Sequence, residues 1–231
     1  MHFHLMQHTP LHGPGRIADW LSSMGHSYTI FHLYAGEAPP SLADGDALIL
    51  LDGPSAGLDV AQLPWGKRER KLVAKALNSH KPLLGIGMGA RMIAAELGAT
   101  VGRGTFIETG WHEVTLAAQS PFDLPETFTA FMWHRDVFAL PDGALPLGSS
   151  SASPVQGFAW DAGRVLGLLC HLEASFASTA ALLDSEEHLA TSGNSPYAQS
   201  RESILAKPQR FDQLAPLLDR LLSQWLRHTL R

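Results

Sequence analysis

Apolar residues in this chain follow two patterns that predict strands alternating with helices. Strand-like runs rich in apolar residues occur at 3–6, 28–33, 47–51, 83–86 and 165–170, and the run at 47–51 is continuously apolar, as is typical of strands buried on both faces. Three other segments space their apolar residues three and four apart, as amphipathic helices do: 17–24, 67–79 and 88–97. This alternation predicts a doubly wound α/β fold, in which a mostly parallel sheet is connected by right-handed crossovers.

The second half of the chain departs from this alternation. Shorter strand-like pieces at 113–116 and 127–133, with turns at 141–143 and 161–163, predict antiparallel strands added at one edge of the sheet. A helix is expected at 174–183, and the apolar spacing from Leu214 to Trp225 predicts a final amphipathic helix. The polar segment between these helices, residues 184–200, is expected to be a mobile loop. No repeat or linker divides the chain, so we expect a single domain over residues 1–231.

Composition narrows the class of protein. Hydrophobic residues make up 45% of the chain, which excludes intrinsic disorder. The net charge of -5, without a long basic block, disfavours nucleic acid as a partner. The single cysteine, Cys170, excludes an intrachain disulfide framework and is compatible with a reducing, cytoplasmic location. No signal peptide and no membrane-spanning run is evident, so we expect neither secretion nor a membrane partner.

Because ligands of open α/β sheets bind beyond the carboxyl ends of the strands, the residues after the apolar runs are the candidates for chemistry. The segment 52–57 follows one run and matches the G-x-S-x-G pattern of a serine nucleophile elbow. Ser55, however, is followed by a loop-like stretch rather than by a helix. A plain turn is therefore the simpler interpretation, and Ser55 as nucleophile is the alternative.

The segment from Gly85 to Arg91 lies at a strand-to-helix junction and fits the dinucleotide fingerprint G-x-G-x-x-A. Its glycines permit tight turning, and a helix N-terminus stabilises negative charge. The acidic residue that this fingerprint requires has only Glu108 as a candidate, in a segment that does not read as a strand end. Short glycine matches are common by chance, and nucleotide binding at Gly85–Ala90 is therefore the weaker interpretation of this segment.

The segment from Cys170 to Glu173 follows the last buried run. His171 and Glu173 are two residues apart, so in an extended chain they share a face. A carboxylate beside a histidine fixes its tautomer and raises its basicity, which is the supporting half of a catalytic triad. A structural hydrogen bond at a strand end would have the same spacing. Cys170 points to the opposite face and is expected to be a small buried hydrophobe.

Several motifs in order along the chain resemble the class I glutamine amidotransferase family, in particular stand-alone proteins similar to the amidotransferase domain of GMP synthase. They are HGPGRI at 12–17, DGP at 52–54, KPLLGI at 81–86, TGW at 109–111, WHRD at 133–136 and GLLCHLE at 167–173. The resemblance covers essentially the whole chain. It implies a flavodoxin-like sheet and hydrolysis of glutamine by an elbow cysteine, which a His-Glu pair activates to form a glutamyl thioester and release ammonia.

The resemblance also assigns roles to residues of this chain. His171 corresponds to the base and Glu173 to its orienter, and backbone N–H groups at Gly53 and Met88 correspond to the oxyanion donors. The nucleophile's position is Gly87, so the thiol is absent. Arg91 stands where the family usually has a substrate-contacting glutamine. Leu169 and Cys170 likewise replace a glutamine and an aromatic residue, so several positions have diverged.

We therefore expect a glutamine amidotransferase homologue, a pseudoenzyme with weak or no glutaminase activity. The alternative is an active hydrolase or transferase that uses Ser55, Cys170 or water as nucleophile and His171 as base. The expected ligand is a small, glutamine-like molecule, and His134 is expected at the edge of the pocket. We expect no cofactor and no metal, since His2, His4 and His8 would suggest a metal site only if carboxylates or further imidazoles converged on them. A separate synthetase subunit finds no support in the sequence.

Overall fold

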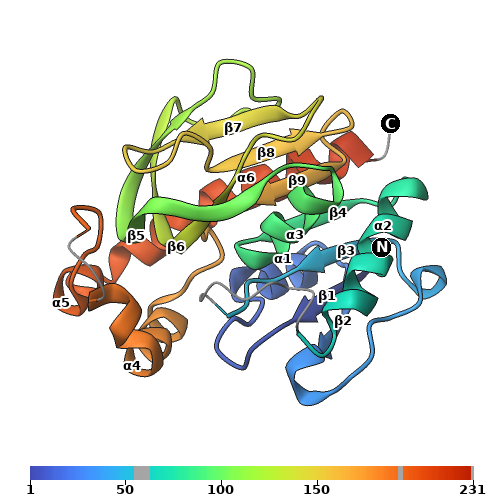
Figure 1. Ribbon diagram of the computed structural model, residues 1–231, viewed down its shortest axis with the longest axis horizontal. Helices are drawn as coiled ribbons and strands as arrows, with labels where there is room; N and C mark the ends of the chain where they lie inside the picture. The colour runs from blue at the N-terminus through green and yellow to red at the C-terminus, as the bar shows by residue number, and fades with distance from the viewer. Residues whose placement is uncertain (55–62, 192–194, 230–231) are drawn as a thin grey trace.

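The computed structural model describes residues 1–54, 63–191 and 195–229, and its centre is one sheet of nine strands (Figure 1). The strand order is β2-β1-β3-β4-β9-β8-β7-β5-β6. The first five of these are mutually parallel: β2 (Ser27–His32), β1 (His2–Gln7), β3 (Ala47–Leu50), β4 (Leu83–Ile86) and β9 (Val165–Leu168). The parallel sheet predicted from the apolar runs is therefore confirmed.

The remaining four strands form the antiparallel edge that the sequence predicts. They are β8 (Gly157–Trp160), β7 (Leu145–Ser149), β5 (Val101–Leu116) and β6 (Thr127–Phe138). The hairpin of β5 and β6 is longer than expected, because its first part pairs through residues 101–103, whose glycine and arginine conceal a strand. A register irregularity between Arg103 and Glu108 separates the two paired parts.

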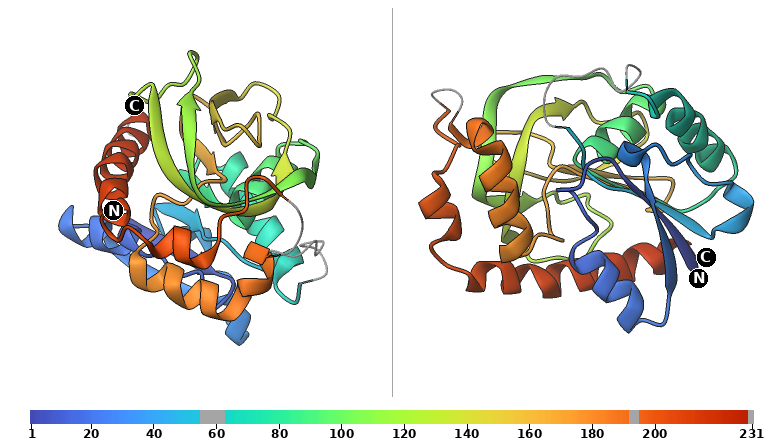
Figure 2. Two further views of the ribbon diagram at one scale, coloured as in Figure 1. Left: turned by 90° about the vertical axis from the view of Figure 1, so that its left-hand side faces the viewer. Right: turned by 90° about the horizontal axis from the view of Figure 1, so that it is seen from below.

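Helices cover both faces of the parallel strands. Alternate residues of each strand point to opposite faces, so Phe3 and Leu5 pack into one core and Met6 into the other. The first core also holds residues of α1 (Arg16–Ser23) and α6 (Gln209–Thr229), and the second holds residues of α2 (Gly66–Asn78) and α3 (Met88–Glu96). Figure 2 shows α1 and α6 on one side of the sheet and α2 on the other. The sheet is therefore doubly wound.

The remaining elements connect this framework. Two short 3₁₀ helices, η1 (Leu33–Ala35) and η2 (Leu42–Asp44), lie between β2 and β3. Two further helices, α4 (Phe176–Thr191) and α5 (Arg201–Leu205), lie between β9 and α6.

The prediction of a mobile loop over residues 184–200 is wrong for much of that segment. Helix α4 continues to Thr191, because the glutamate, leucine and alanine residues there are good helix formers despite their polar setting. Further on, the backbone carbonyl of Tyr197 accepts a hydrogen bond from the N–H of Thr109 at 3.0 Å. The N–H of Gln199 donates to the Thr109 carbonyl at 3.1 Å. These bonds attach residues 197–199 to β5.

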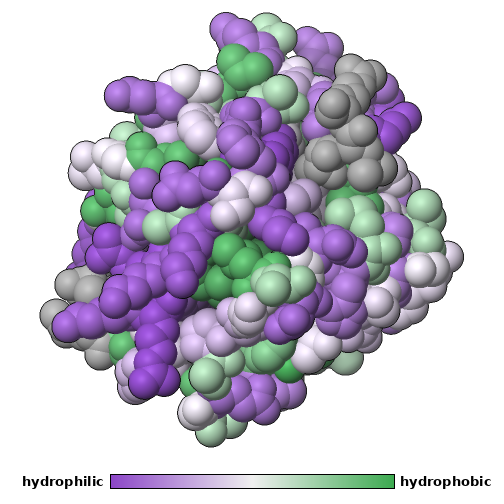
Figure 3. All heavy atoms as spheres, turned by 90° about the vertical axis from the view of Figure 1, so that its right-hand side faces the viewer, coloured by the Kyte–Doolittle hydropathy of each residue, from purple (hydrophilic) through white to green (hydrophobic). Residues whose placement is uncertain are grey.

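The described helices include none that is both long and apolar enough to cross a membrane. On the face drawn in Figure 3, apolar residues form small patches separated by hydrophilic ones. Several large apolar side chains are exposed, as is normal for a protein surface: Met24, Tyr34, Val101, Phe106, Leu140, Leu145 and Phe176.

Close packing of α3 on β3 depends on one glycine. A Cβ at Gly89 would lie 2.3 Å from the Leu50 carbonyl oxygen and 2.6 Å from the Leu50 Cβ. Gly89→Ala should therefore lower the free energy of unfolding by about 1–3 kcal/mol through overpacking, measured by urea denaturation. Gly102→Ala is the matched control, since nothing lies within 4 Å of its added methyl group. Equal midpoints for the two variants would contradict the close approach.

Candidate active site at the carboxyl edge of the sheet

The carboxyl ends of β1, β3, β4 and β9 bring four chain segments together at one edge of the sheet. The loop after β1 supplies His8 and His12, and the end of β3 leads to Asp52. Gly87 joins β4 to α3, and His171 follows β9. These segments are distant in sequence, and the parallel arrangement of the strands makes them neighbours.

Gly87 has the backbone conformation of a nucleophile elbow. Its φ of 52° and ψ of -110° form a sharp junction between β4 and α3, and its N–H donates to the Leu168 carbonyl at 2.8 Å. Such a junction presents the side chain of its central residue above the sheet. Glycine adopts positive φ without a steric penalty, so the elbow is retained here but carries no side chain.

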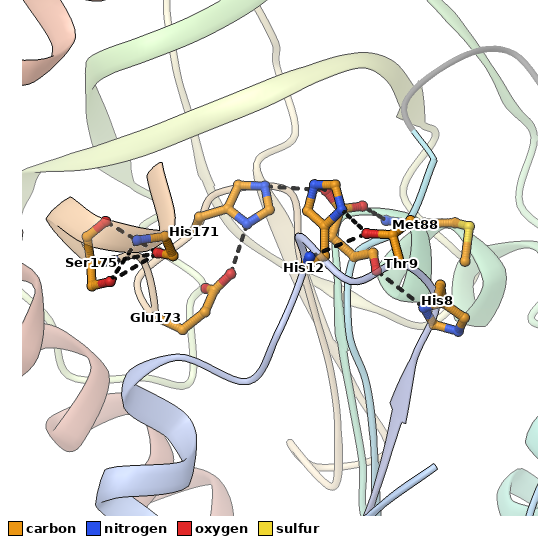
Figure 4. A network of polar contacts seen from close by, with 9 residues as sticks. His8, Thr9, His12, Met88, His171, Glu173 and Ser175 are labelled. Atoms are coloured by element: carbon orange, nitrogen blue, oxygen red, sulfur yellow. Dashed lines mark hydrogen bonds and ion pairs between the residues drawn. The ribbon is translucent and has the colours of Figure 1, made fainter. Parts of the chain in front are cut away.

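The predicted His-Glu pair is confirmed as a contact (Figure 4). The Nδ1 atom of His171 lies 2.8 Å from Oε1 of Glu173, and both residues are buried. The Glu173 carbonyl accepts the N–H of Arg16 at 3.1 Å, and the N–H of His171 donates to the Phe131 carbonyl at 2.8 Å. These contacts hold the imidazole with Nε2 free to face the elbow.

The space beside Gly87 is filled by the carboxylate of Asp52. A Cβ built on Gly87 would lie only 2.2 Å from Oδ1 and 2.3 Å from Cγ of Asp52. The same Oδ1 accepts the Met88 N–H at 2.6 Å, and Asp52 is only 4% exposed. A buried carboxylate therefore occupies the position where the first atoms of an elbow side chain would be.

Two histidines flank this carboxylate. Nε2 of His171 and Nε2 of His12 each lie 3.6 Å from Oδ2 of Asp52, which is too long for a hydrogen bond. Both Nε2 atoms are buried without a hydrogen-bond partner. Nδ1 of His12 lies 2.8 Å from Oγ1 of Thr9, which fixes the direction of that ring (Figure 4).

These groups border a small cavity of about 40 Å³. Its polar lining includes His12, Asp52, His171 and Glu173, and its apolar lining is contributed by Leu11, Phe131, Trp133, Ala174 and Leu182. Since one water molecule needs roughly 10–15 Å³, this volume suits a few waters or a very small polar ligand.

The charges of the site are coupled. Burial opposes protonation of His171, but the Glu173 carboxylate and then Asp52 outweigh it and hold the pKa of His171 above its ordinary 6.5. Burial likewise opposes ionisation of Asp52, but His12, His171 and Arg91 hold its pKa below 3.8. Both shifts favour ion pairing between a protonated His171 and the two carboxylates.

A second buried His-Glu pair supports the same edge. Nε2 of His8 lies 2.8 Å from Oε1 of Glu69, both side chains are fully buried, and Nδ1 of His8 is 3.2 Å from the Asp52 carbonyl oxygen. Burial opposes protonation of His8, but Glu69 outweighs it and raises the pKa of His8. The pair braces the backbone of Asp52.

The other residues implied by the resemblance lie at different distances from the cavity. Gly53 packs against Met88, since a Cβ there would be 2.7 Å from the Met88 sulfur. Arg91 is buried in α3 and contributes positive charge near Asp52 and His171. The imidazole of His134 instead lies 3.2 Å from Glu108, and His134 is not among the residues that line the cavity.

Ser55, one of the alternative nucleophiles, lies outside the described residues. The side chain of Cys170 is fully buried in the core. Added Cβ atoms at Gly85, Gly87 and Gly89 would all meet protein atoms, so packing within the protein accounts for these three glycines without a nucleotide. Across residues 1–54, 63–191 and 195–229, no group of three or more His, Cys, Asp or Glu residues could hold a metal ion.

The sequence pattern does not single out the side chain of Asp52, because the DGP motif indicates a site through its glycine and its backbone N–H groups. The available signal was a charged side chain directly after a buried strand, at the motif position that resembles a glycine of the family.

Cys170 should be chemically inert in the folded protein. Burial, together with the Glu173 carboxylate, raises the pKa of its thiol to about 12. We expect no reaction with a disulfide reagent at neutral pH in the native state and one reactive thiol after denaturation. Rapid reaction of the native protein would contradict the burial and would reopen Cys170 as a nucleophile.

The proton on His171 should couple to stability. Because its pKa is raised on folding, its stabilising contribution is complete below pH 6.5 and is lost as pH rises through the folded pKa. NMR titration should give a midpoint above 6.5 for wild type and a lower one for Glu173→Gln. The difference in free energy of unfolding between the two proteins should shrink with rising pH. A difference independent of pH would contradict the charged arrangement.

Comparison with known proteins agrees with this architecture. The sequence model of the family "Glutamine amidotransferase class-I" matches residues 15–185. The glutamine amidotransferase-like protein YfeJ of Salmonella typhimurium is 26% identical over 212 residues, covering 87% of each chain. The glutamine-hydrolyzing GMP synthase of Aeropyrum pernix is 34% identical over 142 residues, which are 60% of this chain and 25% of that protein.

The fold has close counterparts among solved structures. The crystal structure of a glutamine amidotransferase from Methylobacillus flagellatus superposes with a TM-score of 0.90 at 21% identity, covering 98% of this chain and 94% of that one. The sheet described above is therefore the flavodoxin-like sheet of this group. Since the family model spans well over half of the chain, the protein belongs to the class I glutamine amidotransferase family.

Proposed function

We propose that this protein is a pseudoenzyme of the class I amidotransferase family, which binds a small polar ligand and does not hydrolyse glutamine. The observation that carries the proposal is the elbow itself. Residue 87 is a glycine, and the carboxylate of Asp52 fills the space of its missing side chain. Thioester formation needs a nucleophilic thiol at this point, and neither glycine nor a hydrogen-bonded carboxylate supplies one.

Water is a poor substitute for that thiol in this site. A water molecule would need a general base, and the neighbouring carboxylates favour the protonated form of His171. It would also need an oxyanion donor, and the Met88 N–H already donates to Asp52. The general base and the oxyanion donor are thus both paired with carboxylates of the protein itself.

The proposal leaves the retained polar cavity as the functional feature. A few buried polar atoms, among them Nε2 of His12, Nε2 of His171 and Oε2 of Glu173, have no hydrogen-bond partner and can serve a small ligand. Without ammonia production there is no reason to invoke a synthetase subunit as acceptor. The lone cysteine fits a reducing compartment such as the cytoplasm.

Ammonia release from glutamine tests the proposal. Wild type and His171→Ala should both stay at the background rate, because the reaction lacks its nucleophile. Turnover by wild type that His171→Ala abolishes would contradict the proposal and would point to an active hydrolase with another nucleophile. Turnover that is equal in both proteins would indicate a contaminating glutaminase, which a second purification step would remove.

A further inference from the structure

We propose that Asp52 determines the specificity of this site. Its carboxylate occupies the space of the elbow side chain. It also accepts the hydrogen bond of the backbone N–H that an acyl oxygen would need. The loss of the thiol at Gly87 and the gain of the carboxylate at Asp52 are then one coupled change. This inference rests on the proposed function, and it adds that an acyl substrate such as glutamine is excluded by Asp52 as well as left without a nucleophile.

Steric overlap carries the first half of the argument. Distances of 2.2 Å and 2.3 Å between an added Cβ at Gly87 and the Asp52 carboxyl group are far below van der Waals contact. Asp52 cannot easily move away, because Oδ1 is held by the Met88 N–H at 2.6 Å and its own carbonyl oxygen contacts His8. A side chain at residue 87 and the carboxylate of residue 52 therefore exclude one another.

Hydrogen bonding and charge carry the second half. An acyl oxygen that becomes negative requires N–H donors, and the Asp52 carboxylate accepts the hydrogen bond of the Met88 N–H, the donor directly after the elbow. The carboxylate would also repel a second negative charge formed beside it. The Asp52 carboxylate is the electrostatic partner of His171. In an active relative a thiolate would have this place.

The test is a set of variants in which Gly87→Cys is introduced into three backgrounds: wild type, Asp52→Gly and Asp52→Asn. Asp52→Gly removes the carboxyl group, whereas Asp52→Asn keeps its size and removes its charge. Two quantities are measured for each protein: the melting temperature and the rate of alkylation of the introduced thiol by iodoacetamide. Cys170 provides no background reaction if its thiol is as inert as its burial indicates.

Steric overlap between a side chain at residue 87 and the side chain of residue 52 should lower the melting temperature. Gly87→Cys should lower the melting temperature by about 5 °C or more in the wild-type and Asp52→Asn backgrounds. In the Asp52→Gly background the loss should be much smaller. Failure of Gly87→Cys alone to fold would be the extreme form of the expected result, provided that the double variant folds. A loss in the Asp52→Gly background as large as that in the wild-type background, each measured against its own parent protein, would contradict the coupling.

Charge should appear in the alkylation rates. Without the carboxylate, His171 is the nearest charged partner of the introduced thiol and favours the reactive thiolate. We expect alkylation in the Asp52→Gly background to be about tenfold faster, or more, than in the wild-type background, with Asp52→Asn between them. Equal rates in all three would overturn the inference. That result would leave the proposed function intact, because glutamine turnover by wild type is what tests it.

Discussion

The hydrogen bond from the Met88 N–H to the Asp52 carboxylate is the constraint on which the rest of the site depends. It joins the end of β3 to the first turn of α3, where backbone donors and the helix dipole favour a negative charge. A hydrogen bond to a charged group contributes about 1.5–3 kcal/mol. By fixing Oδ1, this bond also fixes Oδ2 between His12 and His171.

A buried carboxylate is costly unless it is compensated, and the histidine of the His-Glu pair supplies part of that compensation to Asp52. His171 lies between Glu173 and Asp52, and Arg91 adds positive charge behind them. Removal of His171 would take from two buried carboxylates the imidazole that both of them contact. Under the proposed function, the His171–Glu173 pair therefore has a structural and electrostatic role.

Much of this arrangement could be predicted from the sequence, because it depends on local pattern. Apolar runs gave the parallel strands, and the two-residue spacing of His171 and Glu173 gave their contact. The role of Asp52 could not be obtained in this way, since it depends on the distance between two strand ends. The attachment of residues 197–199 to β5 is likewise a tertiary contact, which the polar composition of the segment conceals.

The most direct test of the account is the chemical shift of the Met88 amide proton, followed by NMR against pH. A short hydrogen bond to an ionised carboxylate predicts a strongly downfield resonance, which persists until the pH falls well below 3.8 and disappears in Asp52→Ala. An unshifted resonance, or one that is the same in wild type and Asp52→Ala, would show that Asp52 does not occupy the elbow and would contradict the central claim.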